Sequence, residues 1–568
     1  MTTPLSQADV LDAALGDPWD DSNPAGHRAA LEADERGEPF IEGERRLASS
    51  GLNAQLVPRS EGGLFIRADQ LCELLRTVWR RDPGLALGDG LAPFLAGVAV
   101  WSSGDAGQRA KAAKLLLDGR RLAGCDPGPA LGERPPHPGF AATRAPDGWR
   151  LTGRQTPVAG LRRADALVVL ARTGDPGDER GLSRFLLDKA ELPDSALRYD
   201  RQDADAGLRG AQLESAALTD CPVPDSALLD APGQGFDSLR SAGIARSLLP
   251  AVGLGALDSA LRAVTAMALE TRVCGRGMAE VPLVRSTLTG VFADLLAADA
   301  LCATTLRALH LLPEQAAVYA PSCGYLSARL LREGLEDLRV LLGTRSALPE
   351  GRPAIVRKLA RDSSAAVFGS CSSYSCLAAI LPQLPSLARG GRAVGWSGSA
   401  EPPRLLFDLG AELPELGFAP APADARDAGH FLNTLIEAAG NGGAGVPGPV
   451  GRLARRLREQ AARLRAECAG FGPADLAEGP GAHAFEAASR SAVLLAAGAG
   501  RGVHRHRPDL LDETALAAVL DRLVRRLPAA GVLTQTERME VEDHLWLELL
   551  RRVRQTRLLD LSARRVPG

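Results

Sequence analysis

Residues that could act as nucleophiles or metal ligands are few in this chain, and they stand apart from one another. Ser370, Cys371 and Ser372 form a short run of possible nucleophiles, but no histidine lies near it in the sequence to serve as a base. His504 and His506 lie in the string RGVHRHRPDL. One loop rarely supplies a complete ligand set, so we interpret this string as a basic loop and predict no metal site.

Composition sets wide limits on the class of protein. The 568 residues are 45% hydrophobic and 24% charged, which is ordinary for a soluble protein of several packed domains. A net charge of −3 provides no field that would attract nucleic acid. The nine cysteines are scattered, and the closest pair, Cys371 and Cys376, lacks the CxxC spacing. We expect reduced thiols, a cytoplasmic location, no secretory signal and no membrane-spanning run.

The pattern of apolar residues changes twice along the chain. Helical spacing runs to about residue 120, as in QLCELLRTVWRRD, and then short β-rich strings such as DALVVLART alternate with Gly and Asp turns. Long helical periods return at residue 236. The expected class is α+β, with an N-terminal arm (1–28), an N-terminal helical domain (29–120), a middle antiparallel β domain (121–235), a helical bundle (236–395) and an additional C-terminal helical domain (396–568).

Several strings, in this order, resemble the acyl-CoA dehydrogenase family. LASSGLNAQLVPRSEGGL (47–64) is similar to the segment that ends in VPEEYGGL, and GWRLTGRQTPVAG (148–160) is similar to GYVLNGRKTWISN. GLRG (207–210), DCPVPDSALLDAPGQGF (220–236), ETRVCGRGMAEVPLVRSTLTGVFADL (270–295) and KLARDSS (358–364) follow at the family's spacing. The match covers roughly residues 29–390 and implies the family's fold, a bound FAD and a thioester substrate.

The family's catalytic base is missing from both places where the resemblance would put it. A weakly acidic α-proton needs a positioned carboxylate to remove it. The usual loop after the Arg-Asp pair places Gly369 and Ser370 at the Tyr-Glu positions. In a minority of members the glutamate precedes an arginine on the first long helix of the third domain; here Ala245 precedes Arg246. The resemblance implies that Arg246 and Ser370 line the substrate site.

The flavin contacts that the resemblance implies are partly lost. The TEPxAGS loop has become CDPGPAL, and the Trp-Ile-(Thr/Ser) strand has become Pro157-Val158-Ala159, whereas the preceding threonine and the pyrophosphate-binding arginine remain. The QxxGG motif, which binds a neighbouring subunit's cofactor, keeps only its last glycine in RVLLG. The candidate cofactor-binding residues are Cys125, Gly128, Leu131, Thr156, Pro157, Ala159, Arg272, Gly275, Arg339 and Gly343.

Three functions stay open at this point. The first is a flavoprotein of a biosynthetic pathway whose substrate, such as a β-keto acid that loses CO2, needs no base. The second is a flavin-free acyl-binding enzyme, or a non-catalytic partner of an active relative, on the same fold. The third is ordinary desaturation with another base, for which Asp126 is the nearest candidate. The substrate would be carried by CoA or by an acyl carrier protein, and the family's subunit pairing implies a homodimer.

Overall fold

The N-terminal part of the chain is helical. The computed structural model describes residues 6–125, 139–175, 181–201, 207–229, 238–273, 275–366, 371–385, 402–418, 448–472, 476, 481–529 and 531–567. Its first helices are α1 (Gln7–Leu15), α2 (His27–Arg36), α3 (Ile41–Ser49), α4 (Ala68–Trp79), α5 (Pro83–Ala86), α6 (Ala92–Ser103) and α7 (Ala106–Leu117). The segment expected to be a loose arm contains α1, whose Leu11 and Leu15 are buried. Ser6 and Asp9 begin this helix with a reciprocal capping box.

A seven-stranded sheet follows. Its strands are β1 (Leu122–Cys125), β2 (Phe140–Ala145), β3 (Gly148–Ala159), β4 (Ala166–Arg172), β5 (Leu182–Asp188), β6 (Leu197–Arg201) and β7 (Leu213–Val223). The order is β1-β4-β2-β3-β7-β6, and β5 pairs with β4. Four of the strand pairs are antiparallel, as expected for this domain, but β4 runs parallel to both β1 and β2. Alternation along one strand reports which face is buried and carries no information about the direction of its neighbour.

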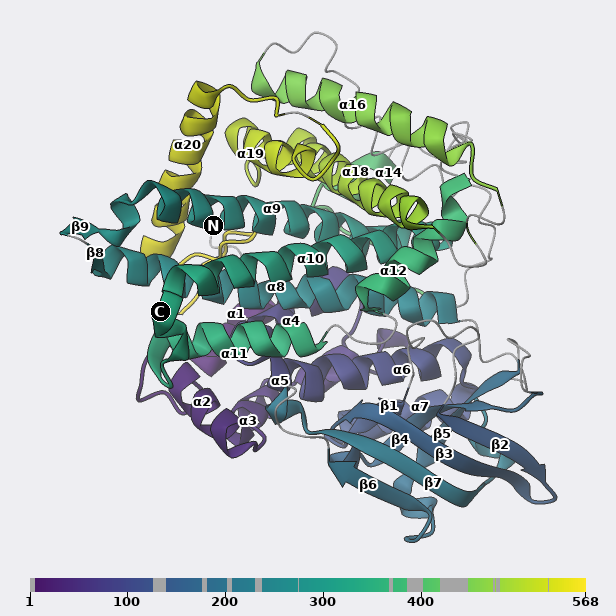
Figure 1. Ribbon diagram of the computed structural model, residues 1–568. Coiled ribbons are helices and arrows are strands. Elements are labelled where there is room, and N and C mark those ends of the chain that lie inside the picture. The colour runs from purple at the N-terminus through teal and green to yellow at the C-terminus, as the bar shows by residue number, and fades with distance from the viewer. Residues whose placement is uncertain are drawn as a thin grey trace.

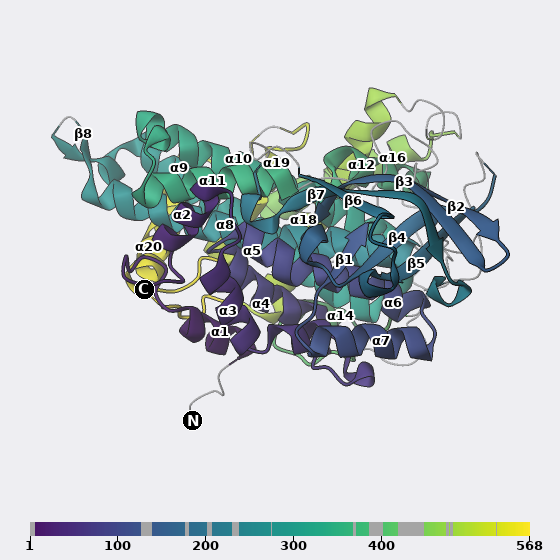
Figure 2. The ribbon, with the colours of Figure 1, turned by 90° about the horizontal axis from the view of Figure 1, so that it is seen from below.

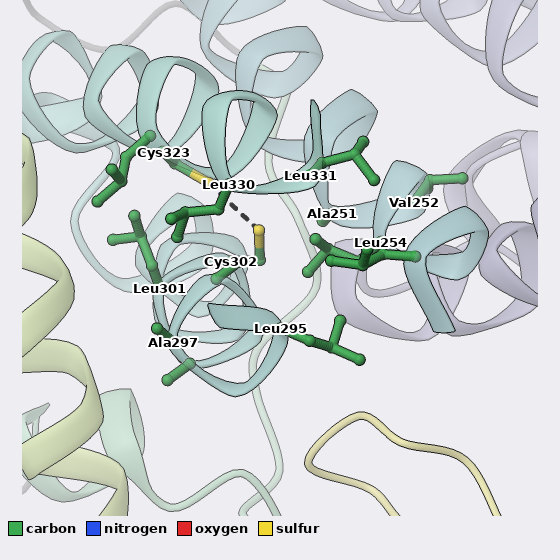
Figure 3. Close-up of a cluster of buried hydrophobic side chains, with 14 of the residues drawn as sticks. Ala251, Val252, Leu254, Leu295, Ala297, Leu301, Cys302, Cys323, Leu330 and Leu331 are labelled. Atoms are coloured by element: carbon green, nitrogen blue, oxygen red, sulfur yellow. Dashed lines mark hydrogen bonds between the residues drawn. The ribbon is translucent and has the colours of Figure 1, made fainter. Parts of the chain in front are cut away.

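Long helices form the bundle above the sheet (Figure 1). They are α8 (Ser238–Glu270), α9 (Pro282–Leu311), α10 (Ala316–Leu342), α11 (Gly351–Ala366) and α12 (Ser373–Ile380), with the hairpin β8 (Arg272–Val273) and β9 (Arg276–Gly277) between α8 and α9. α8, α9 and α10 pack on one another, and α11 lies against α8 and α10. In the core, Cys302 of α9 and Cys323 of α10 point toward each other with their sulfurs 3.6 Å apart (Figure 3).

The C-terminal helices extend the bundle. They are α14 (Pro402–Phe407), α16 (Pro449–Cys468), α18 (Ala482–His506), α19 (Glu513–Val524) and α20 (Gln535–Arg554). α18 packs on α9 and α10, while α19 and α20 pack on α9, so their apolar faces join the core of the bundle. After α20 the chain returns to the N-terminal helices, where Asp560 pairs with Arg76 at 3.1 Å.

Three stretches are long and apolar enough to cross a membrane by length and composition, which corrects the expectation that no run reaches that length. They are Pro83–Ser103, Ser241–Glu270 and Pro282–Leu311, and 78–83% of each apolar window is buried inside the protein. A helix surrounded by other helices is apolar on all sides, so these windows are accounted for by the core of the bundle.

Candidate functional site

Two of the strings that resemble the family meet in the structure. The backbone N–H of Leu208, in the GLRG turn, donates to Oδ1 of Asp362 on α11 at 2.9 Å. Lys358 donates to the other carboxylate oxygen at 2.6 Å, and Arg361 donates to Oδ1 at 2.7 Å. Burial would raise the pKa of Asp362, but the two cations lower it below its ordinary value. The retained Arg-Asp pair is therefore an ionised structural anchor.

The same anchor holds α11 against the N-terminal helices. Nζ of Lys358 lies 3.0 Å from Oδ2 of Asp82, and Nη2 of Arg361 lies 2.6 Å from Oδ1 of Asp34. Burial alone would lower the pKa of Lys358, but the surrounding carboxylates raise it, so the ammonium stays charged. The network fixes the helix that leads into residues 367–370, where the resemblance places the usual base.

A pocket lies between the segments that would carry the two alternative bases. α8, α10 and α11 line it together with Trp79 of α4 and Cys371, which follows the position of Ser370. None of its described lining residues is a carboxylate; the residues are Trp79, Leu249, Pro250, Gly253, Gly324, Ala328, Leu331, Ser363, Ala366 and Cys371. Its free volume is about 10 Å³, scarcely room for one water molecule. An acyl chain therefore needs space that these side chains now fill.

Arg246 lies beside this pocket and contacts a thiol. It hydrogen-bonds the side chain of Cys376 on α12, whose pKa is raised to about 12 by burial despite the nearby positive charge. Gly324 of α10 allows this approach, because a Cβ there would lie 2.8 Å from Sγ of Cys376. Ala245, half-buried against the core, has no ionisable group to offer. Arg246 therefore stands without the glutamate that precedes it in the minority pattern.

The end of β3 is the part of the sheet where the flavin ring is expected. The pairing of β3 with β7 shifts register between Gln155 and Val158, so Thr156 and Pro157 lie within an irregularity of the strand. Ala159, at the end of the strand, packs against the helical core. Cys125 ends β1. Asp126, Gly128, Leu131, Gly369 and Ser370 lie outside the described residues.

The other predicted cofactor residues gather at the far end of the bundle. Arg272 lies in the β8–β9 hairpin, which turns at Gly275 with φ +81°, and Gly343 ends α10 with φ +55°. Arg272 is exposed and makes no ion pair with any described residue, whereas Arg339 pairs with Glu336 at 2.8 Å on the surface. This end of the molecule thus offers an unneutralised cation.

The structure divides the predicted cofactor residues into two groups. Figures 1 and 2 place the β8–β9 hairpin and the sheet at opposite ends of the molecule. α8 joins the two ends, and its 33 residues span about 50 Å. Cys125, Thr156, Pro157 and Ala159 therefore do not meet Arg272, Gly275, Arg339 and Gly343 within one copy of the chain.

Sequence reasoning did not find three contacts of this site. It identified Arg246 but not its partner Cys376, and it matched the Arg-Asp pair without the carboxylates Asp34 and Asp82. One signal was present in the sequence, because Lys358 and Asp362 are four residues apart and so share a helix face. The others join segments more than a hundred residues apart, and no local pattern reports such a contact.

Comparison with known proteins gives partial sequence matches and a shared fold. Over 151 residues the chain is 29% identical to the mitochondrial short-chain specific acyl-CoA dehydrogenase of Sus scrofa, a segment that makes up 26% of this chain and 35% of that relative. The chain thus spans about a third of that curated relative's length. No protein-family model matches the chain.

Solved structures match over a greater length. Butyryl-CoA dehydrogenase from Megasphaera elsdenii has a TM-score of 0.57 at 17% identity, covering 68% of this chain and all of that chain (100%). The prolyl acyl carrier protein oxidase AnaB has a TM-score of 0.58 at 18% identity, covering 66% of this chain and 97% of that chain. These likenesses establish the fold.

Proposed function

Because the chain is a relative of the acyl-CoA dehydrogenases and has their fold, we propose that it is a flavoprotein oxidoreductase that works without their catalytic glutamate. Its substrate is an acyl thioester or a related β-keto acid of a biosynthetic pathway. The name of AnaB, a protein of the same fold, supports a carrier-protein thioester as one form of that substrate. The reduced thiols that we predict accord with a cytoplasmic location.

One observation carries this proposal, namely the absence of a carboxylate from the described lining of the pocket between the two base positions. Removing an α-proton requires a base within hydrogen-bond reach. A β-keto acid avoids that requirement, because loss of CO2 leaves the C–C bonding electron pair on the α-carbon. Arg246, adjacent to the pocket, supplies a positive charge that would hold the departing carboxylate or the thioester oxygen.

The hairpin that carries Arg272 suits FAD better than the end of β3 does. Arg272 is an exposed cation without an ion-pair partner among the described residues, and it suits a pyrophosphate. At the end of β3, Pro157 has no N–H and Ala159 has no hydroxyl, so neither side chain donates a hydrogen bond to the flavin ring. Arg272 and the backbone of β3 would hold the cofactor, which when bound would supply the oxidant. The ring end has lost the hydroxyl that the resemblance places at position 159, and that loss accords with altered chemistry.

A homodimer would bring the divided residues together. Arg272 and Gly343 of one copy reach a cofactor on the sheet of the other copy only if the hairpin end of one chain packs against the sheet end of the other. Leu283 at the start of α9 and Val340 near the end of α10 are 72% and 69% exposed there. Exposed apolar side chains near an unneutralised arginine are typical of a surface that another chain covers.

The test of this proposal compares substrates rather than variants. Full-length protein supplied with FAD is incubated in D2O with butyryl-CoA and, separately, with a β-keto acyl thioester and a β-keto acid. We expect CO2 release and oxidised product from the β-keto acid, whose free carboxylate can leave as CO2, and no CO2 from the thioester, with no deuterium at the α-carbon of butyryl-CoA. Deuterium exchange at that carbon would establish a working base and so refute the proposal. Mutation of Asp126 would then test the remaining carboxylate candidate.

A flavin-free acyl-binding protein is the second candidate. Pro157 and Ala159 favour it, because the resemblance places a ring-covering Trp at the first position and a ring-binding hydroxyl at the second, and this chain has neither. Failure to take up FAD, with retained binding of an acyl carrier protein thioester, would favour this candidate over the first.

A further inference from the structure

A second cavity borders α4, at residues other than Trp79. It is bounded by α4, α9, the turn that follows α18 and the C-terminal segment 558–564. Its volume is about 280 Å³, many times that needed for one water and close to the ~300 Å³ at which small-molecule sites begin. It shares no lining residue with the pocket between the base positions.

Ion pairs account for nearly every charged side chain in its wall. Arg76 lies between Asp299 at 2.8 Å and Asp560 at 3.1 Å, and Arg564 pairs with Asp9 and Asp12. The other pairs of the wall are Arg80 with Asp12, Arg307 with Asp69, and Arg507 with Asp408 and Asp509. Asp69 also pairs with Arg67. Glu73 is the exception, because its carboxylate makes no ion pair or hydrogen bond with any described residue.

The surroundings of Glu73 are unfavourable for a free negative charge. Its pKa is raised to about 7, chiefly because the surrounding protein removes the carboxyl from bulk water and next because Asp69 and Asp560 lie near it. Arg76 and Arg564 oppose this rise and do not cancel it. The side chain nevertheless keeps an exposed surface, and it lines the cavity. A cation bound beside Glu73 would therefore supply the counter-charge that this wall lacks.

The apolar residues of the wall indicate what kind of ligand body the cavity fits. Leu306 of α9, Leu409, Leu510 and Leu558 are apolar and line the same cavity. A wall in which leucines adjoin paired charges and one unpaired carboxylate matches a small molecule that has a cationic head and a short hydrocarbon body.

We propose that this cavity binds a small organic cation, an alkylammonium or guanidinium compound, whose charged head pairs with Glu73. The head pairs with the one carboxylate of the described wall that has no ion-pair partner, and the body covers the leucines. Among the residues that the structure describes, no Lys or Arg side chain takes this place, because each arginine in the wall is engaged by another carboxylate or by backbone oxygens. The site is separate from the flavin chemistry proposed above.

The experiment varies the charge of the ligand on a constant hydrocarbon body. Butylammonium, butanol and butyrate are titrated into full-length protein, near pH 8 so that Glu73 is ionised, and binding is followed by saturation-transfer NMR and calorimetry. We expect saturable binding of butylammonium and at least about tenfold weaker binding of the other two, as a lost charged hydrogen bond implies.

Glu73→Gln keeps the shape of the side chain and removes its charge. We expect it to weaken butylammonium binding by about tenfold or more. Glu459→Gln, which changes an exposed carboxylate paired with Arg456 on α16, should leave binding within about twofold. Equal binding of butyrate or butanol, unchanged binding by Glu73→Gln, or no saturable binding of butylammonium would each overturn the proposal.

Discussion

Leu208 and Asp362 are 154 residues apart in the chain, yet the backbone N–H of the first donates to the carboxylate of the second at 2.9 Å. The bond joins the turn that precedes β7 to the helix that leads to the usual base position. It also gives the Arg-Asp pair a structural role that does not depend on a catalytic base. The pair is needed to position α11 whether or not a glutamate follows it.

Asp362→Asn should therefore destabilise the fold strongly. Asn can still accept from Leu208, but it leaves the buried Lys358 without its nearest counter-charge, at 2.6 Å. Breaking one partner of a buried ion pair costs about 3–5 kcal/mol, so we expect that loss in the free energy of unfolding measured with urea. Asp118→Asn, which breaks an exposed pair with Lys114, should cost less than about 0.5 kcal/mol. Equal effects of the two variants would show that the network is not an anchor.

His27 should make the protein sensitive to mild acid. Burial first, and then Arg81 and Lys358, lower the pKa of His27 to about 3 from an ordinary 6.5. The unfolded chain takes up a proton below pH 6.5 that the folded chain refuses until about pH 3, so stability falls as the pH falls through that window. From about pH 7.5 to about pH 5.5 this group should cost about 1 kcal/mol.

The measurement is the free energy of unfolding of wild type and His27→Gln at both pH values. Gln cannot titrate, so the variant should lose about 1 kcal/mol less than wild type over that interval. His483→Gln, at an exposed position, should change with pH as wild type does. A wild-type loss equal to that of His27→Gln would mean that His27 titrates normally.

Arg272→Ala should weaken FAD binding without unfolding the protein. The side chain is exposed and has no ion-pair partner among the described residues, so its loss costs little stability. If it contacts the pyrophosphate, the Kd for FAD should rise by about tenfold or more in a fluorescence titration. Arg276→Ala, on the paired strand of the same hairpin, should change the Kd by less than about twofold. Equal losses for the two arginines would indicate a general electrostatic effect.

Leu283→Asp should dissociate a homodimer that forms at the hairpin end. Burying an unpaired carboxylate in an interface is costly, so sedimentation should show a shift from dimer to monomer. Leu64→Asp is the matched control, since Leu64 is also exposed but belongs to the N-terminal region. A wild-type monomer, or a dimer that survives Leu283→Asp, would remove the proposed route by which Arg272 reaches a cofactor.

Much of the fold could be predicted from the sequence, because it depends on repeated local patterns. The helical periods before residue 120 and after residue 236, and the β-rich strings between them, correspond to the helices and strands observed. The parallel pairing of β4 with β1 and β2 could not be predicted, since strand direction is set by connections rather than by alternation. Likewise, α1 was missed because polar residues around Asp9 and Asp12 resemble a loop until Arg564 pairs with them.

The site is less predictable than the fold. Matching strings identified Arg246 and the Arg-Asp pair, but only the structure places Arg246 against Cys376 and divides the cofactor residues between two ends of α8. Glu73 carried no sequence signal at all. It lies in an ordinary amphipathic helix. Whether its carboxylate has an ion-pair partner depends on how α9 and the C-terminal segment pack around it, which no local pattern reports.

The most direct test of the proposed function is the visible absorbance of purified full-length protein, mixed with FAD, freed of unbound cofactor and titrated without oxygen with butyryl-CoA. We expect a protein-bound flavin band that butyryl-CoA does not bleach, since no carboxylate in the described pocket lining can take the α-proton. Bleaching by butyryl-CoA would mean that an ordinary dehydrogenase base is present. Absence of a bound flavin band would mean that the fold is used for its acyl site without redox chemistry.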